Sequence, residues 1–323
     1  MLLSLRDLGN KEIKPDVSLH EDTFIQEQSR DIESVGLLAG FKCRHSDDPF
    51  DDNPPGFERI TDDTREMLGQ ICSYANAYMA AQFCTHVFFM LVFPRYARLL
   101  VWDRTRVTVT EKIDLETNTS VLAEFFWQYH NISLTKQGYD DTVRVVSATD
   151  VKQVVPEALK MLGVDDNTRL FEMSLPKNRK FVISAPGYMG TASPTGRSTH
   201  TFKALCMQSK KFVFLKDTWH VISDGLLPGR EIYTKLVEAQ VPHVARLEAF
   251  HDVEGQFTKI HEFRSESWVK LEGFRRFRRS QHYRPVLYEF ARPIQVFKNV
   301  RELVQAFRDA LEGKKPISIF GPN

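Results

Sequence analysis

Apolar and polar residues repeat with two different periods along this chain, and the changes of period mark the predicted elements. Over residues 62–82, apolar positions recur at helical spacing, behind N-cap candidates that begin at Thr61. His86 to Phe93 and Tyr96 to Trp102 are apolar runs of strand length, and Val107 to Thr110 alternates as a half-buried strand. We therefore predict a helix from about Asp62 to Gln82, followed by a small antiparallel sheet.

The residues on either side of this helix and sheet extend the predicted unit. Val35 to Phe41 is an apolar run of strand length, and the Asp- and Pro-rich residues 47–56 indicate an exposed loop. Leu122 to Tyr129 places apolar and aromatic side chains at helical spacing, which favours a core helix, and Gly138 to Asp141 ends the pattern. We assign residues 1–150 to an amino-terminal domain of helices and an antiparallel sheet.

The second half of the chain predicts mainly strands. Short apolar or alternating runs occur at Phe181–Ser184, Thr199–Met207, Val244–Asp252 and Arg284–Phe290, and a loop rich in Gly, Ser, Thr and Pro covers residues 186–198. Helices are predicted over residues 151–162 and 300–311. In the second of them, the apolar positions predicted to face inward are Leu303, Val304, Phe307 and Leu311.

The most informative stretch runs from Lys211 to Glu231. Phe212 to Leu215 is a continuous apolar run that ends in Lys216, as expected for a strand that is buried on both faces and carries a charge at its end. A helical pattern with Glu231 in its first turn follows Pro228. Protein kinases pair such a lysine and glutamate to hold the lysine against nucleotide phosphates. For the pair taken alone, a surface lysine and an ordinary first-turn glutamate are the alternative.

The order of elements from Phe181 onward matches a protein kinase amino-terminal lobe, which has a five-stranded sheet with one main helix. The last strand would lead into a hinge at residues 291–293, where backbone groups contact adenine. We therefore predict an α+β protein, in which the amino-terminal domain is followed by a kinase-like N-lobe over residues 151–312 and a divergent tail over residues 313–323. The C-lobe is absent from this prediction.

Composition narrows the class of protein. Of the 323 residues, 26% are charged and 42% are hydrophobic, as in ordinary globular proteins, and the formal net charge of +1 offers no general attraction for nucleic acids or acidic membranes. The four cysteines are scattered, which predicts reduced thiols rather than a disulfide framework or a zinc site, and the histidines show no zinc-binding spacing. The best apolar window, Val87 to Val101, is interrupted by Pro94, Arg95 and Arg98, so we expect no membrane span. We expect an intracellular protein, cytoplasmic or nuclear.

Several short segments, taken in order, resemble the fungal-type protein kinases. Residues 69–75 with Gln82 are similar to the first helix of that family, and Tyr96–Arg104 is similar to its Arg-x-x-x-Trp-Asp-Arg segment. Gly138–Val143 matches another block, Gly196–Thr199 resembles its Gly-Arg-Ala-Thr turn, and Leu215–Trp219 resembles its Leu-Lys-Asp-Ser-Trp segment. The resemblance resumes at residues 283–310 and covers most of the chain between about residues 12 and 312.

The resemblance implies a kinase that binds ATP and Mg²⁺ and phosphorylates serine or threonine in a protein substrate. Carried over position by position, Lys216 would contact the phosphates, Glu231 would be its helix partner, and Gly196 would lie in the loop over the phosphates. That loop has one matching glycine where a typical kinase has three, although Gly187 and Gly190 lie upstream, so it supports nucleotide binding only weakly. No residue is assigned to a metal.

The resemblance fails just before the catalytic loop. In the family, the helix that matches residues 300–311 leads into a His-Arg-Asp loop with the catalytic aspartate and then into an Asp-Phe/Tyr-Gly-type metal site, and residues 312–323 contain neither. No catalytic residue is therefore predicted, and we expect this chain by itself to be inactive, because positioning and charge neutralisation supply most of the rate of phosphoryl transfer. It would then be a pseudokinase-like module or a fragment of a longer gene product. The alternative is a non-catalytic interaction or scaffold module that binds no nucleotide.

A small lobe without its large lobe would expose apolar surface, for example at residues 300–311 and 317–320. We therefore expect a C-lobe-like partner or self-association through the exposed lobe face.

Two weaker patterns concern nucleic acids, which are not expected partners. Lys14-Pro15-Asp16, followed by Gly40-Phe41-Lys42, resembles the Pro-Asp…(Asp/Glu)-x-Lys layout of restriction-endonuclease-like folds, in which two carboxylates hold a divalent metal. Gly40 stands where the second carboxylate belongs, so we expect a scaffold without nuclease chemistry. A basic run at residues 275–279, with Lys270 and Arg284, would suit phosphate contacts, but such runs are usually solvated loops.

Overall fold

The computed structural model divides the chain into two units, which are described one at a time. It describes residues 17–20, 35–53, 57–146, 158–165, 168–184, 188–189, 193–223, 225–269, 278–289 and 294–317. The first unit comprises Met1–Asp141, Gly190–Ser198 and Gln256–Ser280, and the second comprises Thr142–Met189, Thr199–Gly255 and Gln281–Asn323. The predicted boundary near residue 150 is a single break, whereas these units are discontinuous in sequence.

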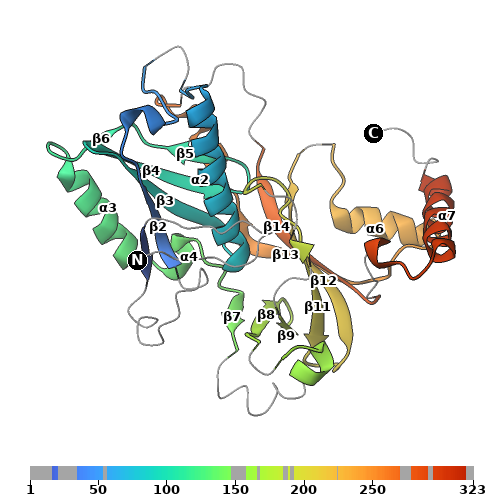
Figure 1. Ribbon diagram of the computed structural model, residues 1–323. Helices are drawn as coiled ribbons and strands as arrows, with labels where there is room; N and C mark the ends of the chain where they lie inside the picture. Colours follow the sequence, from blue (N-terminus) through green and yellow to red (C-terminus); the bar gives the residue numbers. More distant parts are fainter. Residues whose placement is uncertain are drawn as a thin grey trace. The chain divides into compact units, whose positions relative to one another are not determined.

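The first unit contains a six-stranded sheet with the strand order β1-β2-β3-β4-β5 and with β6 beside β4 (Figure 1). Its strands are β1 (Val17–His20), β2 (Val35–Phe41), β3 (His86–Val92), β4 (Tyr96–Asp103), β5 (Val107–Val109) and β6 (Ile113–Asp114). β3, β4 and β5 form the predicted antiparallel meander. β2 runs parallel to β3, because helix α2 carries the chain back to the end of the sheet where β2 began. The sheet is therefore mixed, and the prediction of an antiparallel sheet is wrong for β2.

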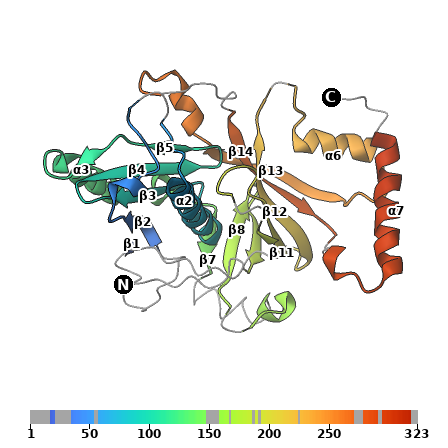
Figure 2. The same cartoon turned by 45° about the horizontal axis from the view of Figure 1, so that its top comes forward.

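Helices cover both faces of this sheet (Figures 1 and 2). α2 (Asp62–Ala81) confirms the predicted helix, and the hydroxyl of Thr61 caps its first turn by accepting the N–H of Thr64 at 3.2 Å. α2 packs on one core with Leu38 and Phe89, whereas α3 (Thr119–Asn131) packs on a second core with their strand neighbours Ala39 and Met90. Because successive side chains of a strand point to opposite faces, each strand contributes to both cores.

Three shorter helices lie in the described part of the first unit. They are the 3₁₀ helix η2 (His45–Asp47), the α-helix α4 (Leu134–Gln137) and the 3₁₀ helix η3 (Ile260–Ser265). α4 ends at Gly138, which adopts a left-handed conformation with φ of 114°. A Cβ atom at Gly138 would lie 2.0 Å from the carbonyl oxygen of His86, so only glycine fits where this turn touches β3.

The second unit contains an eight-stranded sheet with the order β13-β14-β12-β11-β9-β8-β7 and with β10 beside β11. Its strands are β7 (Val143–Val145), β8 (Phe171–Leu175), β9 (Arg179–Ile183), β10 (Tyr188–Met189), β11 (His200–Cys206), β12 (Phe212–Val221), β13 (Leu247–Phe257) and β14 (Ser280–Leu287). The sheet has eight strands where five were predicted, since β7, β8 and β10 add to the expected set. Arg179 of β9 forms an ion pair with Glu248 of the edge strand β13, so the sheet curls strongly.

In the described residues, three α-helices and one 3₁₀ helix accompany the second sheet. Residues 158–162 form a helix that packs Leu159 and Leu162 against Val182 and Leu205 of the sheet, and the predicted helix residues 151–157 lie outside the described part of the chain. α6 (Gly229–Glu238) follows β12, and α7 (Val300–Ile317) follows the 3₁₀ helix η4 (Ile294–Val296). The described residues of all three predicted helices are thus helical, which confirms the α+β class.

α7 differs from its prediction in length and orientation. It runs through Ile317, so the first residues of the expected tail over residues 313–323 are helical, and residues 318–323 lie outside the described part of the chain. Val304, Phe307 and Leu311 were expected to face inward but are 60%, 58% and 63% exposed, and Leu303 is only half-buried, so the apolar surface expected to be exposed at residues 300–311 is present. The helix instead packs through its opposite side, where Gly313 is buried against the Pro242 carbonyl. No helix in the described residues is both long enough and apolar enough to cross a membrane.

Candidate functional site

Lys216 lies within a strand and not at its end. β12 continues to Val221. Asp217 and Trp219, alternate residues on one face of the strand, are buried and keep this part of the chain in the sheet. Lys216 points to the other face, as does Phe214, whose ring centroid is 5.7 Å from the Lys216 Nζ. The side chain is half-buried, and it forms no ion pair with any residue that the structure describes.

α6 begins on the same face of the sheet as Lys216. A Cβ atom at Gly229 would lie 3.0 Å from the Phe250 ring, and that ring stacks on Tyr283 with centroids 5.1 Å apart. The ring of His220 contacts Tyr283 at 4.6 Å, and His220 shares the strand face of Lys216. Four residues of a strand span about 13 Å, so α6 starts well along the strand from the lysine.

Glu231, in the first turn of α6, is exposed, and the described residues contain no ion pair between it and Lys216. The structure thus brings the helix and the lysine to one face without bringing the two predicted partners together. Their pairing stays a prediction, because it needs the helix to lie further along β12 toward Lys216.

Gly196, the third predicted site residue, belongs to the first unit, whereas Lys216 and Glu231 belong to the second. Its backbone N–H donates to the carbonyl oxygen of Arg104 at 2.7 Å, and its φ of 104° suits glycine. The guanidinium of Arg104 is buried and donates to the carbonyl oxygens of Met79 at 3.3 Å and Cys84 at 3.1 Å. The Gly196 amide is therefore engaged by the protein in this arrangement.

Of the three residues predicted to bind a nucleotide, only Lys216 has surroundings that suit this role. Lys216 fits a phosphate group, because it is a half-buried cation without a carboxylate partner among the described residues. The Glu231 carboxylate, in the same unit, is exposed and forms no ion pair with that cation among the described residues. Gly187 and Gly190, the upstream glycines of the same predicted loop, lie outside the described residues.

The opposite face of β12 carries a buried charge cluster that the sequence analysis missed. The Asp217 carboxylate accepts hydrogen bonds from His282 Nε2 at 2.7 Å and from Arg284 Nε at 2.6 Å, and all three residues are buried. The Trp219 ring stacks on the His282 ring at 4.7 Å. Burial alone would raise the pKa of Asp217, but His282 and Arg284 hold it far below its usual range. The cluster joins β12 to β14 directly beside Lys216.

The surroundings of Arg284 contradict its predicted place in a basic run that contacts phosphates. It was grouped with the residues that would meet phosphates, but it is 1% exposed and its guanidinium donates to Asp217 and to the Thr142 hydroxyl, the latter at 2.5 Å. Arg279, in contrast, is exposed and lies over the Phe257 ring at 3.7 Å. Lys270 and residues 275–277 of that run lie outside the described residues.

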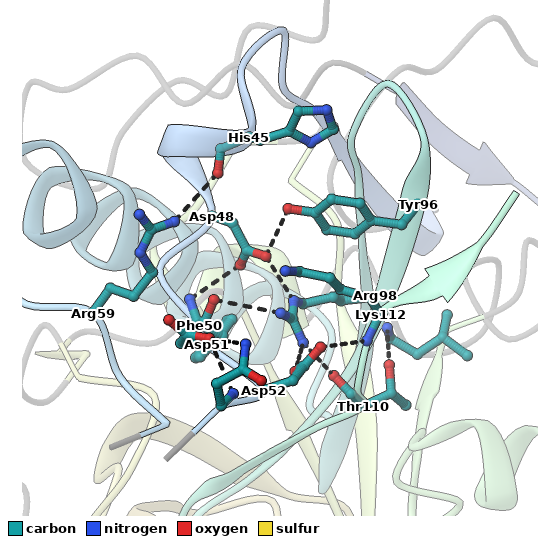
Figure 3. A network of polar contacts seen from close by, with 12 residues as sticks. His45, Asp48, Phe50, Asp51, Asp52, Arg59, Tyr96, Arg98, Thr110 and Lys112 are labelled. Carbon is teal, nitrogen blue, oxygen red and sulfur yellow. Dashed lines mark hydrogen bonds and ion pairs between the residues drawn. The ribbon is translucent and has the colours of Figure 1, made fainter. Parts of the chain in front are cut away.

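The segment that resembles Arg-x-x-x-Trp-Asp-Arg begins with a second buried charge network (Figure 3). Arg98 is fully buried and donates to Asp48 Oδ2 at 2.9 Å, to Asp52 Oδ1 at 2.7 Å and to the carbonyl of Thr110 at 2.9 Å. The Tyr96 hydroxyl donates to the same oxygen of Asp48 at 2.9 Å. Burying a guanidinium costs free energy that neighbouring carboxylates offset, so this motif residue holds the loop after β2 against β4.

The aspartate of that segment ties two parts of the first unit together. Asp103 Oδ1 accepts the N–H groups of Thr105 at 2.7 Å and of Arg106 at 3.1 Å, which closes the turn after β4. Its Oδ2 accepts the N–H groups of Lys259 at 2.9 Å and Ile260 at 3.0 Å, at the start of η3. A single carboxylate thus satisfies four backbone donors, so its role in this structure is architectural.

The nuclease-like pattern is not assembled as a metal site in the described residues. Gly40 lies in β2 under α2, where a Cβ atom would sit 3.4 Å from Phe89 and 3.5 Å from Leu91, so a carboxylate there would face apolar side chains. Lys42 donates to Gln70 Oε1 at 3.0 Å. Asp16 lies outside the described residues.

Comparison with known proteins identifies the lineage. Among protein families, the one described as fungal protein kinase matches residues 58–318, a span that contains Arg98, Asp103, Gly138, Lys216 and Glu231. No curated protein and no solved structure matches the chain. The family match covers most of the chain and confirms the resemblance that the short motifs indicate. The chain therefore belongs to the fungal protein kinase family.

Proposed function

We propose that this chain binds ATP on the Lys216 face of the second sheet and does not transfer the phosphate by itself. On this proposal, the second unit is a kinase-like small lobe in which α6 is the helix that follows the lysine strand. The observation that carries the proposal is the state of Lys216, a half-buried ammonium group that forms no ion pair among the described residues. A partly desolvated cation is stabilised by an anionic ligand, and nucleotide phosphates are such a ligand.

The family supplies the chemical class of that ligand. Fungal protein kinases are named for phosphoryl transfer, and Mg-ATP is the usual phosphoryl donor of kinases. Lys216 would hold an oxygen of the phosphates, and Glu231 would orient Lys216 once α6 lies closer to it. Phosphoryl transfer also needs an aspartate that accepts the proton of the substrate hydroxyl, and these 323 residues contain no His-Arg-Asp or Asp-Phe-Gly segment to supply it.

Thermal unfolding with and without Mg-ATP tests the binding. We expect millimolar Mg-ATP to raise the melting temperature of the full chain, since a ligand that binds only the folded state stabilises it. Lys216→Met should abolish the rise while leaving the nucleotide-free melting temperature near that of the parent. Lys211→Met is the matched control, because Lys211 is an exposed lysine just before the same strand. Equal shifts in both variants, or none in the parent chain, would sink the proposal.

A phosphotransfer assay tests the second half of the proposal. With radiolabelled ATP and a generic serine and threonine protein substrate, we expect no label above background. Sustained, Lys216-dependent labelling by the purified chain would show that it catalyses transfer alone.

A second candidate function, a protein-interaction module, is favoured by the exposed apolar stripe of α7. The stripe consists of Val300, Val304, Phe307 and Leu311, which are 58–68% exposed and recur at helical spacing. Exposed apolar patches of this kind usually mark protein-interaction surfaces. The chain would then bind a C-lobe-like partner or a second copy of itself.

Light scattering on the full chain tests this candidate. We expect the parent chain to associate with increasing concentration and the double variant Val304→Ser/Phe307→Ser to stay monomeric. Val121→Ser, which removes an exposed valine from α3, is the control. If the parent chain is monomeric at all concentrations, self-association is excluded and the partner must be a different protein.

A further inference from the structure

We propose that His243, Asp309 and Glu312 form a binding site for a divalent transition metal, with zinc as the best-suited ion. His243 lies in the turn before β13, and the two acidic residues lie on α7. The site shares no residue with the nucleotide site proposed above. A bound ion would fasten α7 to the turn that connects α6 with β13.

The three side chains already converge. His243 Nε2 is 3.3 Å from Glu312 Oε2 and 3.9 Å from Asp309 Oδ1, and one ligand atom from each residue lies within 4.8 Å of the others. Zinc bonds of about 2.0 Å in tetrahedral geometry place ligand atoms roughly 3.3 Å apart. Small rotations of the Asp309 and Glu312 side chains would therefore bring all three atoms to bonding distance of one ion.

The backbone explains why these residues meet. Asp309 and Glu312 are three positions apart on α7, which puts them on one side of the helix. Gly313 is buried there, and a Cβ atom at this position would lie 3.0 Å from the Pro242 carbonyl oxygen, so the helix lies close against the turn. His243 has a φ of 59°, a conformation uncommon for histidine, and its ring reaches the two carboxylates. The ligands thus come from two segments that already pack together.

The donor set selects the class of ion. One imidazole nitrogen and two carboxylate oxygens suit zinc and its first-row neighbours, whereas calcium and magnesium take oxygen ligands almost entirely. The side chains of His243, Asp309 and Glu312 are 41%, 32% and 37% exposed, so an ion can enter and water can complete its coordination. Arg308 Nε donates to Glu312 Oε1 at 2.9 Å, which orients that carboxylate and leaves Oε2 toward His243.

Zinc titration of the chelator-treated full chain by calorimetry tests the site. We expect about one ion per chain, and the affinity should fall by at least about tenfold in His243→Asn and in Asp309→Asn. Asparagine tolerates the left-handed backbone at position 243, so this variant removes the imidazole with little strain. His130→Asn, which removes an exposed histidine from α3, should bind zinc as the parent chain does. Cobalt in place of zinc should give the visible absorption of a four-coordinate site in the parent and in His130→Asn but not in the two site variants.

Two controls keep the test decisive. Melting of each metal-free variant by circular dichroism shows whether it is folded, and zinc should raise the melting temperature of the parent and of His130→Asn but not of the two site variants. Unchanged affinity in both site variants would mean adventitious zinc binding elsewhere. Absence of saturable binding in the parent would mean that the three side chains form only a hydrogen-bonded ion pair. Either result overturns the proposal.

Discussion

His282 donates a hydrogen bond from Nε2 to Oδ1 of Asp217 across 2.7 Å, in the buried interior of the second sheet. Arg284 donates to the same oxygen from Nε, and Trp219 stacks on the imidazole of His282. The donors come from β14 and the acceptor from β12, which are neighbours in the sheet. The carboxylate next to Lys216 therefore fixes the strand that carries the lysine, and this accounts for Asp and Trp in the family-like segment Leu215–Trp219.

Replacing the carboxylate should destabilise the second unit strongly. Asp217→Asn leaves the buried guanidinium of Arg284 without its counterion, and breaking a buried ion pair on one side costs about 3–5 kcal/mol. Urea denaturation followed by circular dichroism measures the loss. Asp165→Asn, at an exposed aspartate, should change stability by less than about 0.5 kcal/mol. A loss below about 1 kcal/mol in Asp217→Asn would show that the cluster is not a stabilising element.

The same residue predicts a pH dependence. Because the folded state lowers the pKa of Asp217, the unfolded chain binds its proton at a higher pH than the folded chain does. Its contribution to stability is therefore fully present above the unfolded pKa of about 3.9 and is lost as the pH falls below it. We expect the unfolding free energy of the parent to fall more steeply between about pH 5 and pH 2 than that of Asp217→Asn. Parallel pH profiles would contradict this assignment.

Gly138 and Gly163 give a matched pair of backbone variants. Both have positive φ, 114° and 70°, but a Cβ atom at Gly138 would lie 2.0 Å from the backbone of His86, whereas one at Gly163 would meet nothing within 4 Å. Gly163→Ala should therefore cost about 1–2 kcal/mol of backbone strain alone. Gly138→Ala should cost more and lower the soluble yield, because β3 and the turn must separate. Similar melting temperatures for the two alanine variants would argue against the close approach.

Periodicity predicted the local elements well and their arrangement less well. β2 was predicted with the bounds that the structure has, and α2 within one residue, because their apolar patterns are long and regular. The extension of β12 to Val221 was missed, since Asp217 and His220 look like surface residues until their partners on β13 and β14 are known. The parallel pairing of β2 with β3 was missed for a related reason, because pairing direction is set by the route of α2 and not by either strand.

For the candidate sites too, local sequence patterns identified residues but not their spatial arrangement. Lys216 and Glu231 were singled out because local sequence patterns predict the strand and the helix that carry them. The distance between the two side chains, however, depends on where α6 lies on the sheet. Spacing rules for zinc found no site, whereas His243 lies next to two carboxylates that are 66 and 69 positions further along the chain. Amphipathicity identified the apolar face of α7 but not its orientation: the face is not turned inward, and the described part of the chain leaves most of it exposed, as expected for a lobe without its partner.

The cysteines should differ sharply in reactivity. Burial raises the pKa of Cys84 to about 12, so its thiolate is scarce at neutral pH, whereas Cys43 is exposed. We expect iodoacetamide at pH 8 to label Cys43 within minutes and to leave Cys84 unlabelled until the chain is denatured. Peptide mass spectrometry with and without urea measures both. Rapid labelling of Cys84 in the native chain would show that the first core opens readily.

Arg98 provides the sharpest test of the first unit, because a change that keeps its charge should still fail. Its guanidinium serves Asp48, Asp52 and the carbonyl of Thr110 at once, and the single ammonium group of lysine has neither the planar fork nor the reach to replace it. Arg98→Lys should lower the free energy of unfolding by about 3 kcal/mol, the scale of a broken buried pair. Arg95→Lys is the matched control, since Arg95 is exposed and its ion pair with Glu116 lies at the surface, where such pairs contribute about 0–1 kcal/mol. Denaturant unfolding of both variants measures the difference, and equal stabilities would mean that charge alone, without the hydrogen-bond geometry, accounts for the arginine.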